Sequence, residues 1–204
     1  MADDSHDSNV QNRITDLAAL KVFTHPLRIE LWRALGTVRT ATASQLADQV
    51  DEAVSLVSYH LRKMAEHGFI VEAESPEGRG GDGRERWWKP SDDRPFSFRS
   101  SDFHDRPEGA AVASQVVRRL LETRGEQYTT FLDQMASWSK EWMDAAFSSE
   151  TLVRLTPDEL ARCEAELAEV TARWKEHARE AGAEGDDARR EHVALHLYGF
   201  PFRP

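Results

Sequence analysis

The first part of the chain carries apolar residues at helical spacing, separated by residues that begin or end helices. The apolar positions of the first predicted helix, residues 14–23, are Ile14, Leu17, Leu20 and Phe23. They recur at three-residue intervals, which favours a helix with one buried face. Thr24 can cap a second helix, and Pro26 suits its first turn. Gly36 is expected to end that helix.

The next segment predicts two helices joined by a tight turn. Thr42 and Gln45 have the spacing of a capping box, in which each side chain bonds a free backbone N–H of the other residue. A short helix is therefore expected to begin there. Asp51 can cap a longer helix over about residues 52–67, and Gly68 suits its end. This order is typical of a helix-turn-helix.

The longer of these two helices is amphipathic. On a helical wheel its apolar side consists of Val54, Val57, Leu61 and Met64. The opposite side consists of Ser55, Tyr59, Arg62 and Glu66, flanked by Ser58 and Lys63. The apolar side is expected to pack on the core, and the polar side is free to reach DNA.

A two-stranded wing is expected to follow. Residues 69–73 predict a strand, residues 74–84 a loop with four glycines and two arginines, and residues 85–89 the returning strand. Trp87 and Trp88 are adjacent in that strand and should face opposite ways. At least one is expected to pack on the core, and stacking on bases is the alternative.

The second half of the chain predicts long helices with heptad seams. The first seam contains Val117, Leu121, Tyr128, Phe131, Met135, Trp138 and Trp142. The second contains Leu160, Cys163, Leu167, Val170 and Trp174. Two such helices cannot bury both seams alone, so we expect them to pack on each other and on a second subunit. Residues 192–198 alternate in period two, which favours a terminal strand.

Composition and charge refine this interpretation. The chain has 204 residues, a net charge of −10 and one cysteine. Residues 13–90 hold 11 basic and 11 acidic residues, whereas residues 91–204 hold 15 and 22, so the acidity lies outside the predicted DNA-binding part. No apolar run is long enough to span a membrane, and residues 1–9 do not resemble a secretory signal. A cytoplasmic protein is expected.

Three segments together resemble the ArsR-type winged-helix regulators of prokaryotes. They are His25-Pro26-Leu27-Arg28, then Ser55-Leu56-Val57-Ser58-Tyr59-His60-Leu61, then Gly68-Phe69-Ile70-Val71 followed by the Gly/Arg wing. The resemblance covers about residues 17–89 and implies a homodimeric regulator, usually a repressor, that binds double-stranded DNA at a palindromic operator. The chain lacks a Cys-x-Cys pair, so thiolate sensing of metal ions is not expected.

The resemblance also implies which residues contact DNA. The groove-facing group is Ser55, Ser58, Tyr59, His60 and Arg62, with Lys63 beside it. Ser44 and Gln45 would contact the DNA backbone, and the wing residues are Arg79, Arg84 and Arg86. His60 sits at the edge of the apolar side, so a hydrogen-bonded structural role remains open for it.

The predicted fold is mainly α (α+β), a winged helix-turn-helix followed by a helical dimerisation and effector region. The expected parts are a disordered lead-in (1–13), the DNA-binding domain (14–90), a linker (91–108) and the helical region with a C-terminal strand (109–204). A small apolar or aromatic effector could bind among Phe131, Trp138, Trp142 and Trp174, with core and dimer packing as the alternative.

The sequence gives little indication of a metal site, a reactive thiol or a catalytic site. His192 and His196 have a metal-ligand spacing but no fixed partner, and Cys163 is expected to be a buried thiol. No nucleophile elbow or paired carboxylates indicate an enzyme, so no cofactor or metal is expected. The alternative to a DNA-binding regulator is a winged helix used as a protein-interaction or scaffold module.

Overall fold

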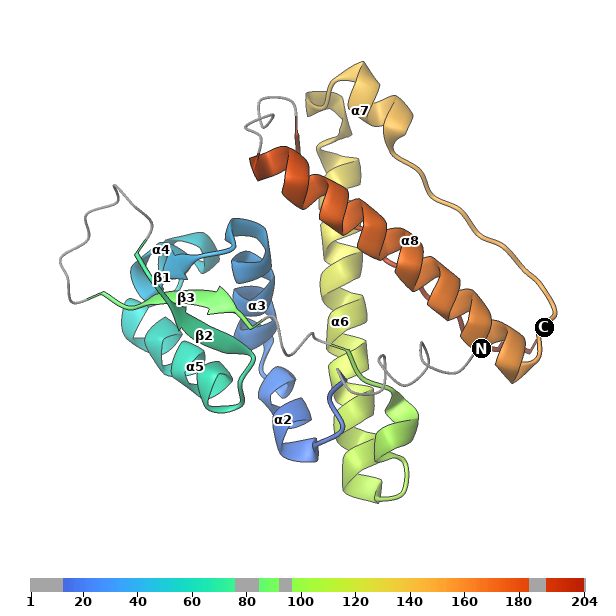
Figure 1. The fold of residues 1–204 in the computed structure, drawn as a ribbon, viewed down its shortest axis with the longest axis horizontal. Helices are drawn as coiled ribbons and strands as arrows, with labels where there is room; N and C mark the ends of the chain where they lie inside the picture. Colours follow the sequence, from blue (N-terminus) through green and yellow to red (C-terminus); the bar gives the residue numbers. More distant parts are fainter. Residues whose placement is uncertain (1–12, 76–84, 92–96, 184–189, 204) are drawn as a thin grey trace. The chain divides into compact units, whose positions relative to one another are not determined.

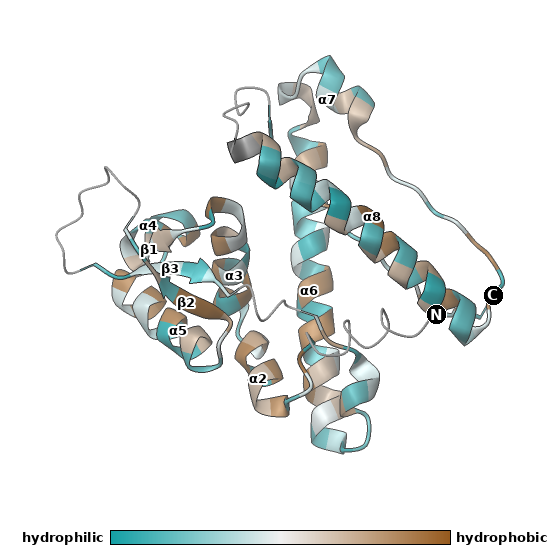
Figure 2. Cartoon of the chain, viewed as in Figure 1, coloured by the Kyte–Doolittle hydropathy of each residue, from teal (hydrophilic) through white to brown (hydrophobic). Residues whose placement is uncertain are grey.

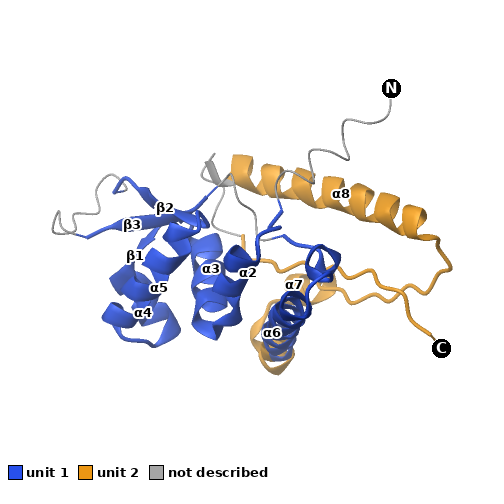
Figure 3. Ribbon diagram, turned by 90° about the horizontal axis from the view of Figure 1, so that it is seen from below, with its two compact units in different colours: residues 1–129 blue, residues 130–204 orange. Residues whose placement is uncertain are grey.

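The structure is a computed structural model and describes residues 13–75, 85–91, 97–183 and 190–203. The chain divides into two compact units, residues 1–129 and residues 130–204 (Figure 3). In the first unit, three helices and a small sheet form a winged helix-turn-helix (Figure 1). This confirms the predicted mainly α class.

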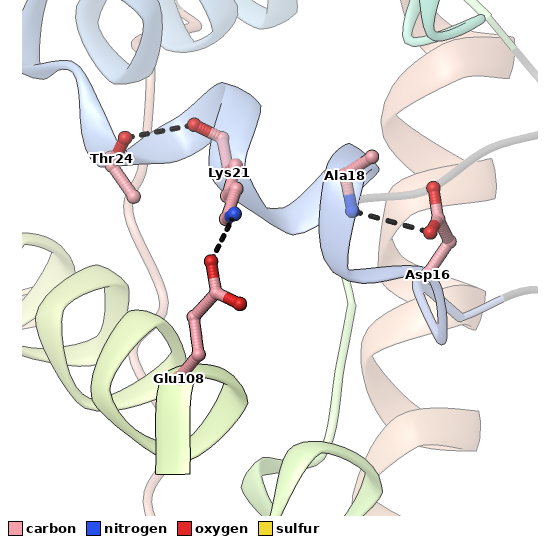
Figure 4. Close-up of polar contacts among 5 residues, drawn as sticks. All are labelled: Asp16, Ala18, Lys21, Thr24 and Glu108. Atoms are coloured by element: carbon pink, nitrogen blue, oxygen red, sulfur yellow. Dashed lines mark hydrogen bonds and ion pairs between the residues drawn. The ribbon is translucent and has the colours of Figure 1, made fainter. Parts of the chain in front are cut away.

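The first unit begins with α2 (Leu17–Lys21), a 3-10 turn η1 (Val22–Thr24) and α3 (Pro26–Val38). Helix α2 begins later than predicted because the Asp16 carboxylate accepts hydrogen bonds from the N–H groups of the first turn (Figure 4). Helix α3 begins at Pro26, as expected, but continues through Gly36. It ends where Arg39 adopts a positive φ of 64°.

The helix-turn-helix consists of α4 (Ala43–Val50) and α5 (Val54–Glu66), preceded by the two-residue strand β1 (Ala41–Thr42). The predicted capping box is confirmed: Gln45 N donates to Thr42 Oγ1 at 3.3 Å, and Thr42 N donates to Gln45 Oε1 at 3.0 Å. Asp51 does not cap α5 as expected. It adopts the left-handed conformation that ends α4, and Ala53 occupies the N-cap position of α5.

The sheet contains β2 (Ile70–Ala73) and β3 (Trp87–Pro90), with β1 on the far side of β3 in the antiparallel order β1-β3-β2. Gly68 makes the turn into β2 with a φ of 72°. Strand β3 is central, because Trp88 pairs with both Ala41 and Glu72. The loop between β2 and β3 lies largely outside the described residues.

The core of the first unit is built on aromatic contacts. Phe23 packs edge-on against Phe69 and Trp32, with ring centroids 4.7 Å and 6.1 Å apart. Both Trp87 and Trp88 are buried, and Trp88 joins the central cluster. The two tryptophans therefore pack on protein, which supports the structural interpretation over stacking on bases.

The core also includes the beginning of α6 (Pro107–Asp133), which follows the 3-10 turn η2 (Ser100–Phe103). Val116 and Ala113 of α6 are buried there. Lys21 Nζ of α2 donates to Glu108 Oε1 at 2.5 Å (Figure 4). The expected linker over 91–108 therefore does not separate two units, because residues on both sides of it share one core.

The second unit contains the end of α6, a 3-10 turn η3 (Met135–Ser137), α7 (Lys140–Ala145) and α8 (Pro157–Ala183). The predicted seam from Val117 to Trp142 does not form one helix. The helix ends at Asp133, and Ser139 begins α7 by accepting a hydrogen bond from Trp142 N.

The C-terminal segment differs from its prediction. Residues 190–203 carry no strand, so the period-two alternation does not produce one in this part of the chain. A strand forms by pairing with a neighbouring strand, and the three-stranded sheet described for the first unit does not include this segment. No helix among the described residues is both long and apolar enough to cross a membrane.

Candidate nucleic-acid interface

Helix α5 presents one polar stripe outside the core. Val57, Leu61 and Met64 are fully buried, whereas Tyr59 and Arg62 are exposed on the other side. The remaining residues of the predicted stripe, Ser55 and Ser58, are exposed and half-buried respectively. The helical wheel therefore identified the outward side of this helix, but it was wrong for Val54, which it assigned to the buried side and which is 45% exposed at the first turn of the helix.

His60 lies on the inner side of α5. Its side chain is 3% exposed. The spacing of Val57, His60, Leu61 and Met64 is that of one helix face, so the pattern that predicted the core also includes His60. Of the two roles open to His60, the structure favours the hydrogen-bonded one.

Arg28 is the partner of His60. Its Nε donates to His60 Nδ1 at 3.0 Å, and its guanidinium also donates to the Val22 carbonyl at 3.1 Å. The His25 ring lies 4.3 Å from the His60 ring. Burial, followed by the charges of His25 and Arg28, lowers the pKa of His60 to about 4. The ring is therefore neutral near pH 7, with its proton on Nε2.

These contacts explain part of the motif His25-Pro26-Leu27-Arg28. They tie the beginning of α3 to the middle of α5, the helix that carries the polar stripe. Arg28 is not among the residues predicted for the interface. The motif was the only signal in the sequence that pointed to it, and the motif does not specify the partner.

The α4 residues predicted to face the DNA backbone already have partners. Ser44 Oγ donates to Glu85 Oε1 at 2.8 Å, which joins α4 to the foot of the wing, the two residues 85 and 86 that precede β3. The side-chain oxygen of Gln45 is used in the capping box. Both residues lie at the beginning of α4, where the backbone N–H groups suit a phosphate.

The basic residues near the stripe have defined contacts. Arg86 forms an ion pair with Glu72 at 3.2 Å, and Lys63 forms one with Glu66 at 2.7 Å. Arg62 Nε donates to the Ser58 carbonyl at 3.3 Å. The predicted wing residues Arg79 and Arg84 lie outside the described residues.

The aromatic residues predicted for an effector pocket belong to the second unit. Trp138 and Trp142 contact each other edge-on with ring centroids 6.3 Å apart, and both are half-buried, as is Phe131. Trp174 is 63% exposed, and its ring lies 5.5 Å from His177. Two of the four predicted residues, Trp138 and Trp142, are thus joined by a ring contact.

Two further predictions concern reactive side chains in the second unit. Cys163 is exposed, not buried, because the α8 seam on which it lies is open in the single chain. His192 and His196 lie in the exposed segment without secondary structure. The described residues contain no group of three or more His, Cys, Asp or Glu arranged to hold a metal ion.

Comparison with known proteins locates the same segment. A family model described as a helix-turn-helix domain matches residues 23–73, from the middle of η1 through α3, α4 and α5 to the end of β2. No curated protein matches the chain. Helix-turn-helix domains are DNA-binding modules, so the match supports a DNA-binding transcription regulator.

Proposed function

We propose that the protein is a sequence-specific transcription regulator of the ArsR type, which binds a palindromic operator as a homodimer and represses transcription. The observation that carries the proposal is the exposed stripe of Ser55, Tyr59 and Arg62 on the second helix of a helix-turn-helix. Such a helix enters the major groove and presents its outward side chains to base edges.

The exposed side chains suit different parts of DNA. The Arg62 guanidinium can donate two hydrogen bonds to a guanine, which is the commonest specific contact in the major groove. The hydroxyls of Ser55, Ser58 and Tyr59 can donate to phosphates, as can Ser44 at the beginning of α4. Arg86, just before β3, would follow the DNA backbone.

Dimerisation is supported by apolar residues that the single chain leaves exposed. Leu167, Val170 and Trp174 share one side of α8, and each is exposed. Hydrophobic and hydrophilic positions alternate along this helix (Figure 2). A helix with an uncovered heptad seam is stabilised by a second such helix, so a second copy of the chain is the partner we propose. Two copies then place two recognition helices about one DNA turn apart.

An apolar or aromatic effector is a further part of the proposal. The half-buried residues Phe131, Trp138 and Trp142 supply aromatic surface in the second unit. An effector bound there would change the indole fluorescence of the tryptophan pair. Such a change on titration with aromatic ligands would identify the class of molecule.

The proposal is tested by selecting DNA with the purified full chain. Fragments from a random pool are bound at near-physiological salt, recovered and sequenced, and the same selection is run with Arg62→Ala. We expect the wild-type protein to enrich a motif with two-fold symmetry, and the variant to lose preference at one position of each half-site.

Absence of enrichment with a folded dimer would contradict the proposal. It would favour the alternative, a winged helix that binds a protein. The observation on which that alternative depends is the pairing of exposed basic side chains with carboxylates, together with the net charge of −10.

A further inference from the structure

Three donor groups on the candidate interface are held by glutamates. Lys63 pairs with Glu66, Arg86 pairs with Glu72, and the Ser44 hydroxyl donates to Glu85. The lysine and arginine nitrogens lie 2.7 Å and 3.2 Å from the carboxylate oxygens, and the hydroxyl oxygen lies 2.8 Å away. Each of these groups could instead donate a hydrogen bond to a DNA phosphate.

The glutamates come from separate parts of the domain. Glu66 lies on the exposed stripe of α5, seven and four residues after Tyr59 and Arg62. Glu72 is exposed on β2, where it lies opposite Trp88 of the central strand. Glu85 reaches α4 from the foot of the wing. The pairing is therefore a property of the whole interface, not of one helix.

A carboxylate beside a phosphate-binding donor has two effects. It neutralises the donor in the free protein, and it repels an approaching phosphate. For two unit charges about 7 Å apart in water, the repulsion lowers affinity about threefold, and more where water is excluded. Arg62 differs from the three donors, because its Nε contact is with a backbone carbonyl.

We propose that Glu66, Glu72 and Glu85 are specificity-determining residues, which suppress binding to DNA that lacks the operator sequence. The proposal rests on the DNA-binding function proposed above. A non-specific complex derives almost all of its affinity from phosphate contacts. On the operator, Arg62 adds base contacts that hold the protein close to the DNA. The phosphates then replace the carboxylates as partners of the three donors, so the glutamates weaken the operator complex less than the non-specific one.

The test measures binding of the full chain to a random-sequence duplex of about 30 base pairs over a range of salt concentrations. The variants are Glu66→Gln, Glu72→Gln and Glu85→Gln, singly and combined. We expect each single variant to bind about two- to fivefold more tightly and the triple variant about 10- to 100-fold more tightly. The salt slope should steepen by about 0.9 for each cation released to a phosphate.

Glu122→Gln is the matched control. Glu122 of α6 pairs with Arg119 at 3.0 Å, and its side chain is 57% exposed, against 61% for Glu72. The substitution removes the same charge from a similar ion pair outside the helix-turn-helix. The control should therefore bind random DNA about as the wild type does.

A charge exchange tests whether the change in salt slope comes from the local net charge or from the loss of the Glu72 carboxylate at its position. Combining Glu72→Arg with Arg86→Glu keeps the pair and its net charge. This double variant should retain the salt slope of the wild type, whereas Glu72→Gln should not.

The outcomes distinguish this inference from the function on which it rests. If the wild type selects an operator but the triple variant gains no more affinity for random DNA than Glu122→Gln, the inference is wrong and the proposed function stands. An equal gain on operator and random DNA also overturns it, because the specificity ratio would not fall. If neither the wild type nor the triple variant binds DNA at about 50 mM salt, both proposals fail.

Discussion

Replacing His60 by glutamine is expected to make the stability of the first unit less sensitive to acid. His60 is 3% exposed, and its Nδ1 accepts a hydrogen bond from Arg28 Nε. The protonated ring could not accept that bond, and it would add a positive charge beside His25 and Arg28. Glutamine offers the same donor an acceptor oxygen that does not titrate in this range.

The magnitude follows from the two pKa values of His60. The pKa is about 4 in the folded chain, lowered from 6.5 by burial and then by the neighbouring charges. Between these values the unfolded chain binds more protons than the folded one, so the free energy of unfolding falls as the pH falls. The stability that the neutral His60 ring contributes is fully present above about pH 6.5 and is lost toward about pH 4. The free energy of unfolding should therefore fall by about 2 kcal/mol between about pH 7 and pH 5, and by at most about 3 kcal/mol in all.

The assay is urea unfolding of the full chain at several pH values in this range. The wild type, His60→Gln and His104→Gln are compared, and the difference in free energy of unfolding is plotted against pH. His104 is exposed, so its replacement controls for the removal of one histidine from the chain. The ring of His60 is also titrated directly by nuclear magnetic resonance.

Two results would refute the reasoning. One is a difference between the wild type and His60→Gln that does not change with pH. The other is a His60 ring that takes up its proton near pH 6.5, which would mean that neither burial nor Arg28 opposes the charge.

Three further predictions concern α6, the DNA contacts and α8. Gly109→Ala should destabilise the first unit by about 1–2 kcal/mol in urea unfolding, because a Cβ there would lie 2.6 Å from a backbone carbonyl oxygen. Gly125→Ala, on the same helix with nothing within 4 Å, should instead stabilise it by up to about 1 kcal/mol. Arg62→Ala should relax sequence choice, whereas Arg86→Ala should weaken binding to the operator without changing which bases are preferred, and should lower the salt slope of the operator complex by about 0.9; equal effects of the two in a binding titration would contradict base reading by Arg62. Trp174→Glu should shift sedimentation toward the monomer, and an unchanged dimer would exclude this side of α8 as the interface.

The features that the sequence determined by itself are local. The capping box of Thr42 and Gln45 joins residues three apart, and Pro26 begins its helix whatever packs against it. The division of α5 into a buried and a polar side follows from helical periodicity alone. Each of these signals depends on a few neighbouring residues, so the helix-turn-helix and its exposed stripe could be predicted from the chain.

Other features depended on residues that are distant in sequence. Arg28 meets His60 across 32 positions, and Ser44 meets Glu85 across 41. Val116 belongs to the core of the first unit, although the polar segment before α6 predicted a boundary there. Periodicity indicates which side of a helix is buried but not what buries it. The partner of His60, the carboxylates at the interface and the limits of the first unit were therefore decided only when packing brought distant side chains together.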